Sequence, residues 1–204
     1  MATVRQQISP AHRGQRMTLE EFQEAEWRPG YLYELARGVL VVTKVPKGKH
    51  AQVVHNAHEL FSDYSRNHRG VIRRIGHGSD VRYVTSAFGS DRHPDLAVLF
   101  GQAPSDIEGG PLSVLGVEVV SRGKRARRRD YVEKREEYLA IGLLEYWIVD
   151  PEERRVTVLL RREADGVAVW EERRFVGDEV IAGDLLPDFL GTVAELWADL
   201  DDAV

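Results

Sequence analysis

Two acidic residues lie in apolar, strand-like segments, and a lysine follows in a helix-like segment. Asp95 opens the apolar run Leu96–Phe100, Glu118 lies inside the run 114–120, and Lys134 comes shortly after them. A carboxylate within a buried strand is costly unless it is paired or binds a cation. Two such carboxylates side by side repel each other, and a bound divalent cation is the usual way in which this repulsion is offset. A bound metal ion with a lysine nearby is a set of catalytic groups suited to phosphodiester hydrolysis.

Each of these residues also has a structural explanation. Asp95 follows a proline, and aspartate is common where a turn leads into a strand. Glu118 is harder to explain this way, although a buried ion pair with an arginine is an alternative. Lys134 could pair with Asp130, one helical turn earlier, at the surface. Helical projection instead places Lys134 beside Tyr138 at the border of an apolar arc, which directs its ammonium towards the sheet edge.

Several other charged residues are candidates for a supporting role. Glu34 is a third acid flanked by apolar residues in a strand-like segment, and His50 stands at the start of a predicted helix, where it could contact a phosphate or cap the helix. A basic run between Glu118 and Lys134 is either a solvated loop and helix start or an edge that faces phosphate. It consists of Arg122, Lys124, Arg125, Arg127, Arg128 and Arg129.

Composition narrows the class of protein. The 204 residues suffice for one domain with a substantial core, and 43% hydrophobic with 30% charged residues is typical of a soluble globular protein. No apolar run is long enough to span a bilayer, so we expect no membrane association and a cytoplasmic location. The absence of cysteine excludes disulfides and thiolate metal sites. A net charge of -5 argues against a protein that coats nucleic acid nonspecifically.

The elements that must position the candidate residues follow from apolar periodicity. We expect residues 1–16 to form a flexible N-terminal tail, without the apolar stretch of a secretory signal, and 17–204 to form a single α/β domain. A capping box at Thr18 and Glu21 predicts a short helix. Further predictions are a hairpin over 31–44, helices over 48–67, 131–141 and 192–200, central strands over 96–100 and 114–120, and strands over 71–75, 79–84, 144–149, 156–160 and 167–175.

Taken together, these motifs resemble the Uma2 family, also known as domain of unknown function 820. The resemblance covers about residues 17–200, and its motifs are specific jointly rather than singly. It rests on Thr18-Leu19-Glu20-Glu21-Phe22, Tyr33-Glu34-Leu35, Gly38, His50, Pro94-Asp95-Leu96-Ala97-Val98, Glu118-Val119-Val120-Ser121, Asp130, Lys134, Tyr138, Gly142, Glu145-Tyr146-Trp147-Ile148-Val149-Asp150 and Leu186-Pro187-Asp188-Phe189.

The resemblance implies the PD-(D/E)XK restriction endonuclease-like fold, a mixed β-sheet core flanked by α-helices. Asp95, Glu118 and the backbone carbonyl of Val119 would then hold Mg²⁺ or Mn²⁺, with Glu34 as an accessory acid for a second metal. The usual nuclease lysine lies two residues after the glutamate, where this chain has Val120. Lys134 on the following helix matches the lysine that Uma2-like sequences supply instead. The implied catalytic residues are Asp95, Glu118 and Lys134.

Two functions from different classes follow. The first is a Mg²⁺-dependent endonuclease that hydrolyses DNA, for which a homodimer is plausible because double-strand cleavage needs two sites. The second is a catalytically silent, nuclease-like module that binds nucleic acid or a protein partner. Retention of Asp95, Glu118 and Lys134 favours the enzyme, whereas the acidic net charge favours the module. A purely structural ion-pair network ranks last.

Overall fold

A six-stranded mixed sheet forms the centre of the molecule. The computed structural model describes residues 7–101, 106–107 and 112–200. Strands β10 and β11 are parallel, and every other pair of neighbours in this sheet is antiparallel. The order across the sheet is β13 (Val167–Val176), β12 (Arg155–Ala164), β11 (Leu143–Asp150), β10 (Leu112–Val119), β8 (Leu96–Phe100) and β5 (Ile72–His77).

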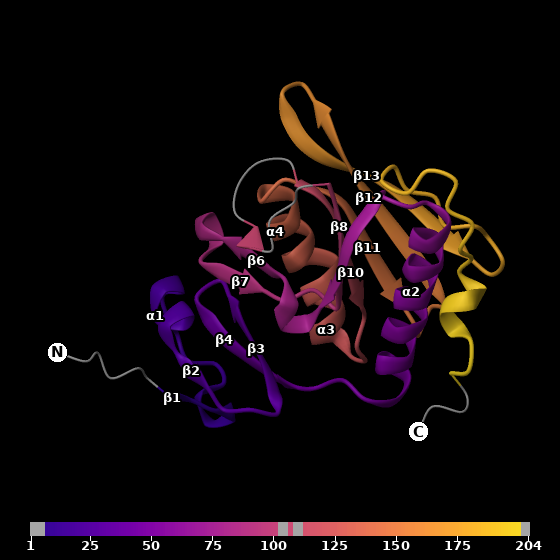
Figure 1. Ribbon diagram of the computed structural model, residues 1–204. Coiled ribbons are helices and arrows are strands. Elements are labelled where there is room, and N and C mark those ends of the chain that lie inside the picture. Colours follow the sequence, from indigo (N-terminus) through magenta and orange to yellow (C-terminus); the bar gives the residue numbers. More distant parts are fainter. Residues whose placement is uncertain (1–6, 102–105, 108–111, 201–204) are drawn as a thin grey trace.

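Helices cover both faces of the central sheet (Figure 1). Helix α2 (Gly48–Asn67) packs its apolar stripe on one face, against alternate residues of β8, β10 and β11. The other face lies against a continuous helical segment composed of α3 (Lys124–Arg128), a π-helical turn η4 (Arg129–Glu133) and α4 (Lys134–Ala140). Strands buried on both faces must be apolar throughout, which explains the sequence of β8 and β10. This is the mixed α/β architecture expected from the sequence.

A smaller five-stranded sheet stands beside the central one and carries the hairpin predicted over 31–44 (Figure 1). Its core contains Tyr33, Leu35, Leu40 and Val42. The strand order is β4 (Val39–Lys44), β3 (Tyr31–Ala36), β7 (Ser90–Arg92), β6 (Arg82–Thr85) and β9 (Asp106–Ile107), with α1 (Leu19–Glu24) and the parallel pair β1 (Gln7–Ile8) and β2 (Glu26–Trp27) alongside.

The N-terminal region differs from the expected tail in residues 7–16. The Ile8 side chain is fully buried with the core of the small sheet, and β1 pairs with β2. Arg16 also forms a β-bridge with Val39. An isolated isoleucine in a polar segment gave no periodic pattern from which this packing could be predicted. The predicted capping box is confirmed, since the Thr18 N–H donates to Glu21 and the Glu21 N–H donates to the Thr18 hydroxyl.

The predicted closing helix over 192–200 is wrong in its length. The chain forms only a 3₁₀ turn, η5 (Ala194–Trp197), because Ala198 returns to extended ψ and Asp199 adopts a φ of 57°. Val193, Leu196 and Trp197 are nevertheless buried against the α2 side of the sheet. Among the described residues, no helix has the length and apolarity needed to cross a membrane.

Candidate active site

The register of the central sheet brings the two strand carboxylates together. Leu96 on β8 pairs with Val117 on β10, and continuing this antiparallel register by one residue places Asp95 opposite Glu118. Side chains of directly opposed residues project to the same face of a sheet. The alternation of β10 sends Val117 and Val119 towards α2 and therefore sends Glu118 to the face covered by α4. The predicted juxtaposition of these two acids is present.

Asp95 is held by one strand and one helix. Its Oδ2 accepts a hydrogen bond from the Val119 N–H at 2.8 Å, and its Oδ1 lies 3.2 Å from His50 Nε2 at the start of α2. The other ring nitrogen of His50 lies 3.4 Å from the Ser121 hydroxyl. Burial works to raise the pKa of Asp95, but the hydrogen bonds from His50 and Val119 outweigh it and the pKa falls below its usual value. Asp95 is therefore ionised at neutral pH.

Glu118 is the most strongly perturbed acid of the site. Its side chain is 2% exposed, and its Oε1 accepts hydrogen bonds from Lys134 Nζ at 2.7 Å and the Tyr138 hydroxyl at 2.6 Å. Among the described residues, all hydrogen bonds to this carboxyl group go to Oε1. Burial, together with the charges of Asp95 and Asp130, raises the pKa of Glu118 to about 8 despite the opposing charge of Lys134. Glu118 therefore holds a proton to a higher pH than an ordinary glutamate does.

Lys134 projects inward rather than pairing with Asp130. Its Nζ lies 2.7 Å from Glu118 and 3.0 Å from Glu34, and the side chain is 2% exposed. The reason is the π-helical turn η4, in which the Lys134 N–H donates to the Arg129 carbonyl and the usual one-turn spacing is interrupted. Asp130 accepts from the Arg129 guanidinium instead. Burial works to lower the pKa of Lys134, but the charges of Glu118 and Glu34 raise it, so the ammonium stays charged.

Glu34 enters the site from the small sheet. Besides Lys134, it accepts from the His93 N–H at 3.1 Å and lies 3.5 Å from Arg92. Burial works to raise the pKa of Glu34, but the charges of Lys134 and Arg92 lower it to about 2. Glu34 is thus ionised and contacts the Lys134 ammonium together with Glu118. Lys134 thus contacts one acid from each of the two sheets.

A cavity of about 160 Å³ opens over these groups. Most of the basic run, for which a solvated segment and a phosphate-facing edge were the two alternatives, does not line this cavity. Arg122 pairs with Glu152, Arg127 with Asp150 and Glu153, and Arg128 with Glu133. Arg129 is the member of the run that lines the cavity. The other residues that line the cavity are Leu32, Glu34, Thr43, Lys44, Pro46, His50, His93, Asp95, Glu118, Ser121 and Lys134.

The oxygen atoms of this cavity match the chemistry of a hard divalent cation. Asp95 and Glu118 supply carboxylates, and the Val119 carbonyl faces the same neighbouring strand as its N–H, which contacts Asp95. Within the described ranges, no group of three or more histidine, aspartate or glutamate side chains is close enough to hold a metal. A cation would therefore rest on two carboxylates and a carbonyl, with water completing its coordination.

Two residues of the site, Tyr138 and His50, have partners that the sequence did not indicate. Tyr138 was assigned only to an apolar arc, yet its hydroxyl donates to Glu118. His50 had no preferred partner, and the structure places it against Asp95. One sign was available for Tyr138. It lies on the apolar face of a helix, and this face covers a strand that contains a glutamate. No local sign could have paired His50 with a residue so distant in the chain.

Comparisons with known proteins agree with this architecture. Residues 19–194 match the model of the Uma2 family, whose description is "Putative restriction endonuclease". A solved structure described as a putative nuclease belonging to DUF820, from Anabaena variabilis, superposes with a TM-score of 0.68 over 90% of this chain and 99% of that chain, at 16% sequence identity. This likeness confirms the restriction endonuclease-like fold. No curated protein matches the chain. The family match extends over most of the sequence, and the chain therefore belongs to the Uma2 family.

Proposed function

We propose that this protein is a metal-dependent nuclease that hydrolyses phosphodiester bonds in DNA. One observation carries the proposal: Asp95 and Glu118 face each other at the end of two central strands, and Lys134 enters the same cavity with its ammonium 2.7 Å from Glu118. A buried, unevenly charged cluster that opens to a cavity is typical of a functional site. The family description, a restriction endonuclease, is in keeping with this chemistry.

Asp95, Glu118 and the Val119 carbonyl would hold Mg²⁺ or Mn²⁺ in this proposal. When bound, such a cation supplies a more acidic water molecule and positive charge against the phosphate. Asp95 is ready to act as a ligand because it is ionised, whereas the raised pKa of Glu118 means that a proton competes with the cation for this carboxylate. His50 keeps Asp95 oriented through the contact between its Nε2 and Oδ1 of Asp95. Glu34 would serve a second metal only by giving up its contact with Lys134.

Lys134 would act on the phosphate or on the attacking water. An ammonium group is a compact point charge with three donors, which suits it to orient a water molecule or to stabilise charge that develops on phosphate oxygens. The contacts with Glu118 and Glu34 hold Nζ in place before substrate arrives. Tyr138 supports the same arrangement by donating to Glu118.

A cleavage assay tests this proposal. Supercoiled, linear and single-stranded DNA are incubated with purified protein in Mg²⁺, Mn²⁺ or EDTA, beside Asp95→Asn and Lys134→Met variants. Lys124→Met is the matched control, because Lys124 is exposed on the same helical segment. We expect metal-dependent cleavage by the parent and the control and loss of cleavage in both site variants. Equal cleavage by the parent and the site variants would refute the assignment.

A catalytically silent module that binds nucleic acid is the second candidate. It is favoured by the absence, among the described residues, of a preformed group of three acidic or histidine ligands, and by the engagement of Lys134 with two acids. The same assay separates the two functions. DNA binding without cleavage under any metal condition would replace the enzyme with the silent module.

A further inference from the structure

A second, larger cavity adjoins the candidate active site. Its volume is about 340 Å³, within the range of small-molecule binding sites of about 300–1,000 Å³. Aromatic side chains from α1, β2 and β3 dominate its wall, and polar groups from β6 and the segment after β7 complete it. The residues on which the inference depends are Phe22, Trp27, Tyr31, Tyr33, Arg82 and His93.

The aromatic residues of this cavity form a connected series of rings. The Trp27 ring lies 4.6 Å from the Phe22 ring and 4.8 Å from the Tyr33 ring, and the Tyr31 ring lies 6.4 Å from that of Tyr33. Phe22 and Tyr33 are buried and hold the outer rings in place, whereas Trp27 and Tyr31 are half-buried. Rings supported from behind and partly open to a cavity offer rigid surfaces on which a flat ligand can stack.

Polar groups accompany these rings. Arg82 donates to Asp91 and keeps its side chain 31% exposed, so its guanidinium lies at the wall of the cavity. His93 lines the same cavity and supplies a second polar side chain to its wall. The cavity therefore suits a ligand that is both aromatic and polar.

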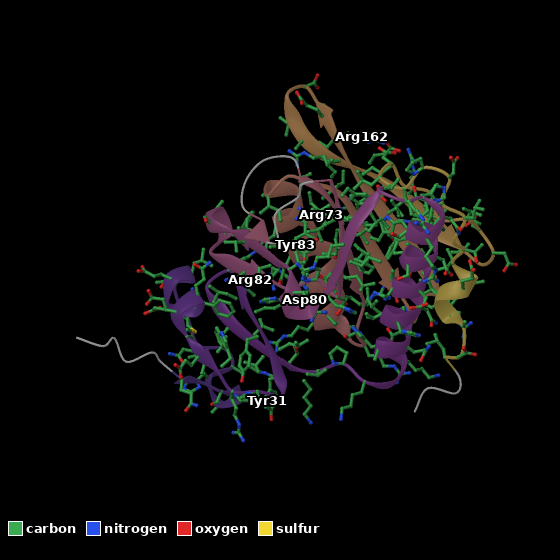
Figure 2. The ribbon with its side chains drawn as sticks, viewed as in Figure 1. Tyr31, Arg73, Asp80, Arg82, Tyr83 and Arg162 are labelled. Atoms are coloured by element: carbon green, nitrogen blue, oxygen red, sulfur yellow. The ribbon has the colours of Figure 1, made fainter. Side chains whose placement is uncertain are left out.

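The position of the cavity links it to the proposed chemistry. It shares Leu32 and His93 with the cavity of about 160 Å³ at the candidate active site, called the catalytic cavity below. The His93 N–H also donates to Glu34, the acid that contacts Lys134. A third cavity, of about 490 Å³, shares two other residues, His50 and Ser121, with the catalytic cavity. Its wall carries Lys47, Lys49, Arg122 and Arg154. The catalytic cavity thus adjoins an aromatic cavity and a second cavity whose wall carries several basic side chains. Figure 2 labels Tyr31 and Arg82 on the side of the small sheet, far from Arg162 on the β12–β13 hairpin.

We propose that the aromatic cavity binds an unpaired nucleobase of the strand whose phosphate occupies the catalytic cavity. The inference rests on the proposed function and specifies its substrate class as DNA that is single-stranded or locally unpaired. A base inside a duplex has both faces stacked and its pairing edge occupied, so it cannot enter such a cavity without leaving the helix. Stacking on Trp27 and Tyr31 would accept every base, because every base has a π face.

A binding measurement in EDTA tests this without requiring cleavage. Fluorescence anisotropy compares a labelled single-stranded oligonucleotide with an oligonucleotide of equal length in which every nucleotide is abasic, so that the phosphate charge is unchanged. We expect the parent to bind the base-containing strand more tightly by roughly fivefold or more, the ratio that stacking of a single base provides. Tyr31→Leu removes most of this preference. Phe88→Leu, a half-buried aromatic outside the cavity, retains it.

The outcomes separate this inference from the proposed function. Equal binding of the two strands by the parent, binding of neither, or equal weakening of both by Tyr31→Leu would overturn the nucleobase cavity, even if the protein cleaves DNA. A base-dependent preference without any metal-dependent cleavage would overturn the nuclease instead. Trp27→Leu is the second variant if Tyr31→Leu does not fold, and thermal melting checks the folding of each.

Discussion

Two buried carboxylates at the ends of neighbouring parallel strands have similar helix contacts and different balances of charge. Glu118 is next to last in β10 and Asp150 is last in β11. The helical segment above them supplies each with a basic side chain and a tyrosine hydroxyl four residues later: Lys134 and Tyr138 for Glu118, Arg127 and Tyr131 for Asp150. The two carboxylates differ in the hydrogen bonds of their second oxygen atoms.

Asp150 is saturated with donors, whereas Glu118 is not. The Oδ1 atom of Asp150 accepts from the N–H groups of Glu152 and Glu153 at 3.1 and 3.2 Å. The described hydrogen bonds of Glu118 use Oε1 alone, and the neighbouring charges of Asp95 and Asp130 act against its ionisation. A saturated carboxylate stabilises a turn and a helix. A carboxylate with a spare oxygen that faces a cavity and another acid is equipped to bind a cation.

The largest expected contrast is in catalysis. Replacing Glu118 with glutamine removes a ligand without changing the shape of the side chain, and we expect cleavage to fall by roughly 10²- to 10³-fold, as on removal of one group that stabilises developing charge. Asp150→Asn should leave the rate per folded molecule close to that of the parent. Single-turnover cleavage by the two variants measures this contrast. A similar loss in both would show that the two acids do not differ in role.

Stability should show the opposite order. Asp150→Ala leaves Arg127, Tyr131 and two N–H groups without their acceptor, and we expect a loss of about 2–3 kcal/mol in the free energy of unfolding. Glu118→Gln should change this free energy by less than about 1 kcal/mol, because burial and the neighbouring acids offset most of what the charge of Glu118 gains from Lys134, as its raised pKa indicates. Urea unfolding at neutral pH measures both values. A greater loss for Glu118→Gln would contradict the proposed charge balance.

The pH dependence of metal binding follows from the raised pKa of Glu118. The folded state holds this proton up to a pKa of about 8, whereas the unfolded state releases it near the ordinary glutamate pKa of 4.5. The folded state binds more protons between these values, so this group lowers stability as pH rises through the interval. Binding of a cation must displace the proton, so Mg²⁺ affinity should rise with pH up to about 8, by at most about tenfold per unit. Glu118→Gln should remove this slope, and calorimetric titrations at several pH values measure it.

The smallest effect is expected at an exposed ion-pair cluster. Arg162 donates to Glu171 at 2.7 Å and to Asp184 at 2.6 Å, and its side chain is 37% exposed. Solvent screens such contacts, so Arg162→Gln should alter stability by no more than about 0.5 kcal/mol and leave cleavage and Mg²⁺ binding unchanged. Thermal melting and the cleavage assay check this. Arg162→Gln is the baseline variant with which the effects of substitutions at Glu118 and Asp150 are compared.

Much of this site could be predicted from the sequence because it depends on alternation in strands. Apolar strands buried on both faces make Asp95 and Glu118 conspicuous, and the family resemblance places Lys134 with them. Helical projection predicts that Lys134 points towards the sheet, as it does, but not its contacts with Glu118 and Glu34, because a π-helical turn before it alters the regular projection. The role of Glu34 as a partner of Lys134 depends on how the small sheet packs beside the central one.

Other parts of the fold depend on contacts that leave no local pattern. The burial of Ile8 requires the small sheet to be in place, and the 3₁₀ turn at Ala194–Trp197 ends where Ala198 and Asp199 leave helical geometry. Asp150 accepts from the N–H groups of Glu152 and Glu153, as an aspartate at the start of a turn commonly does. Its additional bond to Arg127 arises from tertiary packing.

Calorimetric titration with Mg²⁺ below pH 8 is the most direct test of the central claim, that Glu118 and Asp95 form a cation site whereas Asp150 is structural. We predict that the parent and Asp150→Asn bind Mg²⁺ and release about one proton per cation, and that Glu118→Gln and Asp95→Asn bind at least tenfold more weakly, roughly the loss expected for a metal ligand. Absence of Mg²⁺ binding in the parent, or equal affinity in the parent and Glu118→Gln, would contradict the claim.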